Sequence, residues 1–167
     1  MALRNIIQEP SEQLRKISRP VKEITPRIEI LLDDLAETMK AADGVGLAAP
    51  QVGVLRRAGV IDIGDEHGLI ELINPVITFR EGEQKGEEGC LSCGSRRGVV
   101  TRPMKVTVVA KNRKGMEVTY DAEGLLARAM CHEIDHLDGH LFIDVMEEEL
   151  FDDDEEVLDG EIADDEE

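Results

Sequence analysis

Apolar residues recur at helical spacing in two separate parts of the chain. The first part is residues 26–42, and its apolar positions are Ile28, Leu31, Leu32, Leu35 and Met39. Positions three and four residues apart share one face of a helix, so this face can pack against a core. Thr25 can cap the start of this helix, Pro26 suits its first position, and Gly44 follows its end. The second part, residues 123–138, predicts another long helix.

Four runs between these helices have the alternation and β-branched content that are typical of strands. They are AGVIDI (58–63), LIELINPVITF (69–79), KVTVVAKN (105–112) and MEVTYDA (116–122). The last two flank a short Arg-Lys-Gly segment and predict a hairpin. A shorter helix is predicted over residues 11–18, before Pro20. Together these elements predict an α+β fold, in which several mostly antiparallel strands pack around the second helix and an N-terminal helix lies beside them.

Residues 43–53, with the sequence DGVGLAAPQVG, show neither pattern. Three glycines, a proline and small side chains predict a loop at this position. The backbone of such a loop can approach another group closely, because few side chains stand in the way.

Acidic residues are concentrated at the end of the chain. The formal net charge is −18, and residues 147–167 hold 14 of the 37 acids and no Lys or Arg. We therefore predict one folded domain over residues 1–146, which is large enough to bury its own core. Residues 147–167 are predicted to form an acidic tail that is partly helical or disordered, because its charges repel one another. The rest of the chain has no strongly basic face, which argues against direct nucleic-acid binding.

No segment has the features of export or membrane insertion. The chain has no apolar run long enough to span a bilayer, and its first 20 residues lack the apolar stretch of a signal peptide. Its three cysteines cannot all pair internally, which favours functional or buried thiols over a disulfide framework. The sequence therefore predicts a cytoplasmic protein without a membrane partner.

The run HEIDH, residues 132–136, lies within the second predicted helix. Residues four apart share a helix face, so His132 and His136 can bind one metal ion. Glu133 is then placed to contact a water molecule on that ion without being a ligand itself. The alternative is an exposed helix that carries its histidines by chance. His140 is eight residues from His132, about 12 Å along a helix, and is too distant to share the ion.

A catalytic metal usually has three protein ligands and one open position, so a third ligand must come from elsewhere. Cys90 and Cys93 are available in GEEGCLSCGS, residues 86–95. Cys90 alone would complete an open catalytic site, whereas both thiols would make a closed structural Cys2His2 site. The open site is favoured because Glu133 has a role only there. The gap between the thiols and the histidines is also long for a zinc finger.

Three motifs together resemble those of the peptide deformylase family. They are GVGLAAPQ (44–51), EGCLS (88–92) and HEIDH (132–136). They occur in the family's order and approximate spacing, and the resemblance extends from about Leu3 to about Asp144. It implies a metallohydrolase domain over residues 1–146. The implied reaction removes the N-formyl group from the N-terminal formylmethionine of newly made polypeptides and releases formate.

The resemblance assigns the metal ligands and the proton carrier. Cys90, His132 and His136 would hold one divalent metal, with Fe(II) favoured and Zn(II) or Ni(II) able to substitute. Glu133 would be the general acid and base. A zinc peptidase is a rival interpretation, which would need a downstream ligand such as Glu147 and would leave Cys90 idle.

The resemblance also implies the substrate contacts. The Gln51 side chain and the Leu91 N–H would stabilise the negatively charged oxygen that forms on the attacked carbonyl. Gly46 would contact the substrate backbone. Leu125 and Ala129, on the same face of the predicted helix as His132, could form the wall of a methionine pocket or could belong to ordinary core packing.

Other positions differ from the family pattern or leave alternatives open. Arg97 and its basic neighbours can contact substrate carbonyls or can simply face solvent. Cys131 occupies a position where the family usually has glutamine, and Cys93 is an additional thiol. We hypothesise that Cys90 and Cys93 pair on oxidation and expel the metal. Docking on the ribosome through the tail is not expected, because ribosomal RNA would repel its acids.

Overall fold

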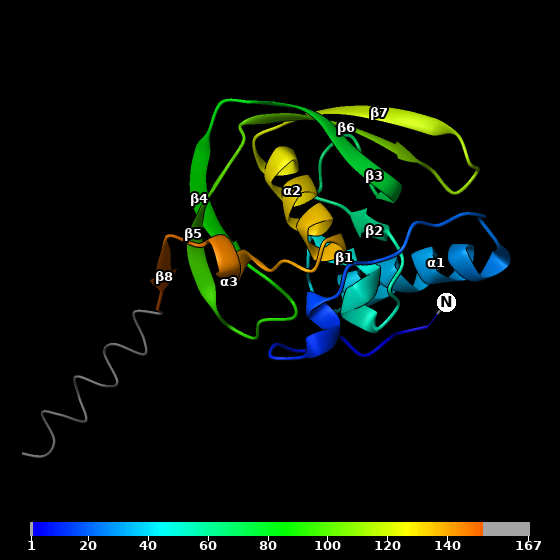
Figure 1. Cartoon of the computed structure of the whole chain (residues 1–167), viewed down its shortest axis with the longest axis horizontal. Helices are drawn as coiled ribbons and strands as arrows, with labels where there is room; N and C mark the ends of the chain where they lie inside the picture. Colours follow the sequence, from blue (N-terminus) through cyan, green and yellow to red (C-terminus); the bar gives the residue numbers. More distant parts are fainter. Residues whose placement is uncertain (1, 152–167) are drawn as a thin grey trace, which may run out of the picture.

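A computed structural model describes residues 2–151 of the chain (Figure 1). Its helices are η1 (Glu12–Arg15), α1 (Pro26–Ala41), η2 (Ala49–Val52), α2 (Leu125–Leu137) and α3 (Phe142–Val145). The two long helices, α1 and α2, begin and end within two residues of the predicted bounds. Pro26 occupies the start of α1 as expected, whereas the Thr25 side chain makes no capping hydrogen bond. The short helix predicted over residues 11–18 is confirmed only as the single 3-10 turn η1.

Five strands form one antiparallel sheet. In spatial order they are β1 (Gly46–Ala48), β2 (Ala58–Ile61), β3 (Ile70–Glu81), β6 (Lys105–Lys111) and β7 (Glu117–Glu123). The hairpin predicted for the last two is confirmed, with Lys105 opposite Glu123 and Lys111 opposite Glu117. β1 is an edge strand of this sheet, so one side of its backbone is not covered by another strand of residues 2–151.

A second sheet was not predicted. Its strands are β4 (Gln84–Gly89), β5 (Arg97–Arg102) and β8 (Glu148–Leu150), paired in that order and antiparallel. The residues of β4 include no apolar side chain, so hydrophobic alternation could not reveal this strand. The helical start expected for the acidic tail is wrong, because Glu148–Leu150 pairs with β5 instead. Residues 152–167 of the predicted tail lie outside the described residues.

Helix α2 lies between the two sheets (Figure 1) and packs against strands of both of them. Its buried face joins β2, β3, β6 and β7 in one apolar cluster, which includes Leu126, Met130 and Ile134. Helix α1 packs against β1 and β2 in a second cluster around Leu32 and Leu35. This arrangement confirms the predicted α+β fold with mostly antiparallel strands around a central helix.

The loop predicted for residues 43–53 is only partly correct. Gly46–Ala48 forms β1 and Ala49–Val52 forms η2. Leu47 and Ala48 are fully buried and pair with β2, which gives this glycine-rich segment a regular backbone. No helix within residues 2–151 is both long and apolar enough to cross a membrane.

Candidate active site

The central helix brings the predicted histidines and Glu133 to the middle of the molecule. His136 and Glu133 are buried, and His132 is nearly so. A buried helix face explains this placement, because α2 is covered by strands on several sides. The alternative of an exposed helix with chance histidines is therefore wrong.

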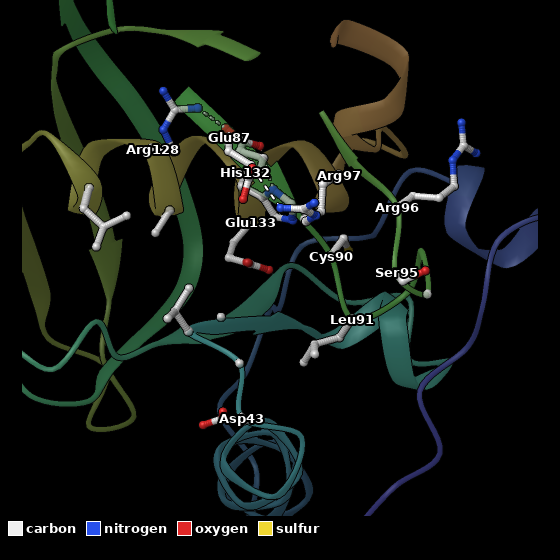
Figure 2. A pocket seen from close by; sticks show the side chains of 18 residues that line it. Asp43, Glu87, Cys90, Leu91, Ser95, Arg96, Arg97, Arg128, His132 and Glu133 are labelled. Atoms are coloured by element: carbon white, nitrogen blue, oxygen red, sulfur yellow. Dashed lines mark hydrogen bonds and ion pairs between the residues drawn. The ribbon is translucent and has the colours of Figure 1, made fainter. Parts of the chain in front are cut away.

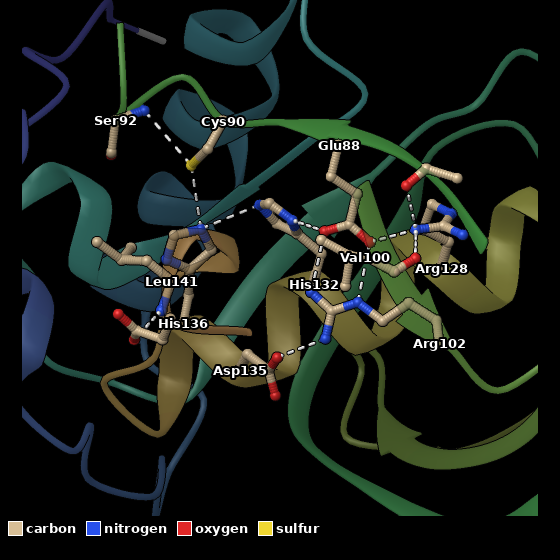
Figure 3. Close-up of polar contacts among 12 residues, drawn as sticks. Glu88, Cys90, Ser92, Val100, Arg102, Arg128, His132, Asp135, His136 and Leu141 are labelled. Carbon is tan, nitrogen blue, oxygen red and sulfur yellow. Dashed lines mark hydrogen bonds and ion pairs between the residues drawn. The ribbon is translucent and has the colours of Figure 1, made fainter. Parts of the chain in front are cut away.

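Three possible metal ligands converge at one point. Cys90 Sγ lies 3.3 Å from His136 Nε2, which lies 3.2 Å from His132 Nε2 (Figure 3). All three atoms are within 4.8 Å of one another. Three lone pairs facing one another fit a cation placed between them, and a thiolate with two imidazoles suits Zn(II), Fe(II) or Ni(II). Among the described residues Cys93 does not belong to this group, which favours the open site over a closed Cys2His2 site.

A buried carboxylate orients the first histidine. Glu88 Oε1 lies 3.0 Å from His132 Nδ1, which leaves Nε2 of the same ring facing the other two ligands. Arg102 donates to both Glu88 oxygens, from Nε at 2.9 Å and from Nη2 at 2.9 Å (Figure 3). Burial alone would raise the pKa of Glu88, but the hydrogen bonds from Arg102 and His132 hold that pKa well below its usual range. Glu88 is therefore an ionised partner of a histidine that could bind a metal, an arrangement common at metal sites.

The protonation of the second histidine also suits a ligand. Burial lowers the pKa of His136 well below its usual value, and the neighbouring His132 lowers it further. His136 is therefore neutral, which is the form that binds metals. Its Nδ1 is buried and accepts or donates no hydrogen bond within residues 2–151.

Glu133 has the environment of a proton carrier. Burial raises the pKa of its carboxyl to about 7, against the lowering effect of His132. Its Oε1 has no hydrogen-bond partner in the described part of the chain. A Cβ atom added to Gly46 would lie 2.8 Å from Glu133 Cδ, so only glycine leaves room for this carboxylate. Figure 2 shows the Glu133 side chain pointing from α2 into the cavity beside Cys90 and Leu91.

The two residues predicted to bind the oxyanion, Gln51 and Leu91, both lie next to Cys90. Gln51 is buried, and its Nε2 lies 3.0 Å from Ser92 Oγ and 3.5 Å from Cys90 Sγ. Its Oε1 accepts a hydrogen bond from the Ala48 N–H at 2.9 Å, which fixes the amide. The Leu91 N–H has no acceptor among the described residues. These contacts hold the Gln51 amide beside Cys90, and the Leu91 N–H is available to a ligand.

A cavity of about 550 Å³ opens beside these groups (Figure 2). Most of the predicted site residues line it: Gly46, Cys90, Leu91, Arg97, Leu125, Ala129, His132 and Glu133. Gln51 and His136 do not line it, but both contact Cys90 Sγ. Leu125 and Ala129 both line the cavity on its α2 side; Leu125 is exposed, whereas Ala129 also belongs to the buried apolar cluster of α2. Arg97 is held in an ion pair with Glu87 at 2.9 Å.

The remaining predicted positions lie outside the ligand group. His140 is exposed beyond the end of α2, as expected. Cys131 is a buried thiol, and burial raises its pKa to about 11, so it is unreactive. Glu147 pairs with Lys85 at 3.1 Å and does not approach the histidines, which removes the ligand that the zinc peptidase interpretation needed.

Sequence reasoning missed a buried network of three charged residues beside the site. Glu88, Arg102 and Arg128 are all buried and form one network behind His132. Glu88 was recognisable in principle, because it belongs to the EGCLS motif and metal-binding histidines usually have an acidic partner. Arg128 lies four residues before His132 on α2, a spacing that places it on the same helix face.

A thiol and two imidazoles that converge beside a buried carboxyl are typical of a metal-dependent hydrolase. The comparisons with known proteins identify the type. The family model for polypeptide deformylase matches residues 3–151. A peptide deformylase of Acetivibrio thermocellus is 59% identical over 144 residues, which cover 86% of this chain and 84% of that protein. One from Thermoanaerobacter pseudethanolicus is 56% identical, over 86% of this chain and 89% of its own.

A solved structure agrees with these sequence relatives. The crystal structure of a peptide deformylase from Legionella pneumophila has a TM-score of 0.84 and 46% sequence identity, and covers 87% of this chain and 86% of that chain. The chain therefore belongs to the polypeptide deformylase family, and it is a hydrolase. Deformylation of N-formylmethionyl peptides is the activity of this family.

Proposed function

We propose that this chain removes the N-formyl group from the formylmethionine of newly made polypeptides, using Cys90, His132 and His136 to hold one divalent metal. The observation that carries this proposal is the convergence of these three ligand atoms within 4.8 Å, next to the buried Glu133. Fe(II) is the favoured metal, and Zn(II) or Ni(II) can substitute, because the donor set suits all three. A cation held there would supply Lewis-acid chemistry and lower the pKa of a water molecule.

Glu133 moves the proton. Its carboxylate takes a proton from the attacking water and later gives that proton to the amine that leaves from the formyl carbon. A pKa of about 7 suits both steps, since the carboxyl can accept and donate near neutral pH. The absence of a protein partner on Oε1, within the described chain, leaves that oxygen available to the water.

The Leu91 N–H and Gln51 Nε2 stabilise the oxygen that becomes negatively charged. The role of the Leu91 N–H is supported by the fact that it donates to no acceptor among residues 2–151. Gln51 Nε2 lies 3.5 Å from Cys90 Sγ and can donate to an oxygen bound beside that thiolate. Donors aimed at a developing oxyanion typically lower the barrier by roughly 3–4 kcal/mol each.

The peptide substrate lies along the edge strand β1. Gly44, Val45 and Gly46 line the cavity at that edge, and an extended peptide can add to a free strand edge by backbone hydrogen bonds. Leu125 and Ala129 form the apolar wall for the methionine side chain. Arg97, held by Glu87 at the mouth of the cavity, contacts carbonyl groups further along the peptide.

The partner is therefore a nascent chain in the cytoplasm. Neither direct nucleic-acid binding nor ribosome docking through the acidic tail belongs to this proposal. The prevalence of acids in residues 147–167 supports this, because phosphate groups would repel them.

Formate release from formyl-Met-Ala-Ser by the Fe(II)-loaded protein tests the proposal. Loss of the proton carrier in Glu133→Ala should lower kcat by roughly 10²–10⁴-fold. Cys93→Ala should retain activity, because Cys93 is not a ligand in an open site. Peptide-bond cleavage without formate would support the peptidase interpretation. Loss of both activity and bound metal in Cys93→Ala would support the closed Cys2His2 site.

A further inference from the structure

Arg128 is a buried cation on the wall of the active-site cavity. Its side chain is only 8% exposed, and it lines the cavity on the same α2 face as Leu125, Ala129 and His132. Its Nη1 contacts Glu88 Oε2 at 2.7 Å and the Val100 carbonyl oxygen at 3.1 Å (Figure 3). Arg128 therefore joins α2 to β4, through Glu88, and to β5, through Val100.

Gly86 provides the space for this guanidinium. A Cβ atom added to Gly86 would lie 2.9 Å from Arg128 Nη2 and 3.2 Å from its Cζ. Nη2 itself is buried and donates to no acceptor among the described residues. Burying a charge with an unused donor disfavours folding, so packing alone does not account for an arginine here.

The contacts of Arg128 lead directly to the first histidine. Glu88 Oε2 receives hydrogen bonds from Arg128 Nη1 and Arg102 Nε, and Oε1 receives one from Arg102 Nη2 and contacts His132 Nδ1. A carboxylate can accept about four hydrogen bonds, so each acceptor position of Glu88 is used. With all four occupied, the carboxylate cannot turn without breaking a bond in the dry interior.

We infer that Arg128 is a positioning residue, which holds Glu88 so that Glu88 fixes the ring of His132 toward the metal. Arg102 approaches Glu88 from β5 and Arg128 approaches it from α2, the helix that also carries His132. Arg128 thereby couples the orientation of Glu88 to the position of the helix. This inference rests on the proposed role of His132 as a ligand.

The test is the rate at which Zn(II)-loaded protein releases its metal to a chromophoric chelator. Arg128→Met, which is similar in length and uncharged, should release Zn(II) roughly tenfold faster, within the range found for outer partners of metal ligands. Arg128→Lys keeps a cation and should recover most of the parental half-life. The matched control is Arg113→Met, because Arg113 is also held by acidic partners, Glu71 and Asp33, but does not line the active-site cavity. This control should leave the release rate within about twofold, since distant sites act independently.

Gly86→Ala provides a second variant that keeps every charge. Its added methyl group would push the Arg128 guanidinium away from Glu88, so it should also speed Zn(II) release. This variant keeps the inference testable if Arg128→Met does not fold.

A double-mutant cycle with Glu88→Gln decides whether Arg128 acts through Glu88. If it does, Arg128→Met should change the release rate much less in the Glu88→Gln background than in the parent. Equal effects in both backgrounds would overturn the inference, as would a lower melting temperature with an unchanged release rate. If the proposed ligand itself is wrong, His132→Ala will bind Zn(II) as well as the parent, which is a separate outcome.

Discussion

Gly46 and Glu133 lie so close together at the active-site cavity that a side chain at position 46 would displace the Glu133 carboxylate. Gly46 belongs to the edge strand β1 and Glu133 to the central helix α2, so the two elements meet at the Glu133 carboxylate. The glycine is needed for its missing side chain, because a Cβ atom there would lie 2.8 Å from Glu133 Cδ. The contact between these residues therefore sets the position of the carboxylate.

Gly46→Ala should displace that carboxylate and lower kcat for formate release. A misplacement of about 1 Å can cost about 10²-fold in rate. Bound metal should remain at the parental level, because the three atoms nearest to the added methyl group all belong to Glu133 and none to a proposed ligand. Val76→Ala, an exposed change on β3 outside the cavity, is the control. Parental kcat in Gly46→Ala would show that Glu133 does not need its present position.

Gln51→Met should show whether the buried Gln51 amide stabilises the oxyanion or only holds the turn at Cys90. If Gln51 Nε2 stabilises the oxyanion, kcat should fall by roughly 10²-fold or more while metal content is retained. Ser92→Ala removes only the oxygen that Nε2 contacts at 3.0 Å and should cost much less. Metal analysis and steady-state kinetics on both variants give the answer. A Gln51→Met protein that loses its metal would mean that the amide holds the Cys90 turn and has no direct role in the reaction.

Oxidation should join Cys90 to Cys93. The Cys93 N–H donates to the Cys90 carbonyl oxygen at 3.0 Å, which closes a turn, and both side chains belong to one apolar cluster. One thiolate attacks peroxide, giving a sulfenic acid and releasing water after protonation. The other thiol then attacks that sulfur, releasing a second water and leaving a disulfide.

Peroxide should therefore release the metal from the parent and leave a Cys90–Cys93 disulfide that mass spectrometry can identify. In Cys93→Ser the metal should be lost more slowly, and Cys90 should appear as sulfinic or sulfonic acid. Cys131→Ser should behave as the parent, because its thiol is buried elsewhere. Recovery of only free or over-oxidised thiols from inactivated parent would refute the pairing.

Asp34 should make folding stability depend on acid pH. Burial would raise the pKa of its carboxyl, but the Ala2 N–H at 2.7 Å and the Arg4 guanidinium at 2.8 Å outweigh burial and lower it. The pKa of Asp34 is therefore lower in the folded protein than its value of about 3.9 in the unfolded chain. The stabilisation of the fold by the ionised Asp34 is complete above the unfolded pKa and is lost as the pH falls through the folded pKa.

Asp34→Asn should therefore unfold at lower denaturant concentration than the parent at pH 7. The expected difference is about 1 kcal/mol, because Arg4 is partly exposed and water screens the pair. The difference in the free energy of unfolding should shrink between pH 5 and pH 3. An equal difference at every pH would mean that the charge of Asp34 does not contribute.

The parts of the fold that sequence patterns could predict are those with strong periodicity. Helices α1 and α2 and the β6–β7 hairpin have regular apolar positions, because one face of each element is buried in a common core. The pairing of the two histidines was also predictable, since histidines four residues apart on a helix can share a metal, whereas Cys90 was assigned as the third ligand only by the resemblance to a family.

Charged residues buried by tertiary pairing could not be predicted in this way. β4 has no apolar residue, and Glu88 is buried there only because Arg102 and Arg128 reach it from two other elements. The start of the acidic tail forms β8 because Arg96 contacts Glu149 at 3.0 Å, which offsets part of the local repulsion. These partners are distant in the sequence, so no local pattern reveals them.

The ligand shell of the metal tests the account most directly. Zinc K-edge X-ray absorption on Zn(II)-loaded protein with one metal per chain counts the sulfur atoms bound to the metal, at about 2.3 Å for Zn–S. The account predicts one sulfur and two imidazole nitrogens, with the sulfur lost in Cys90→Ala and kept in Cys93→Ala. Two sulfurs in the parent, or a sulfur that disappears with Cys93, would contradict an open catalytic site and with it the proposed chemistry.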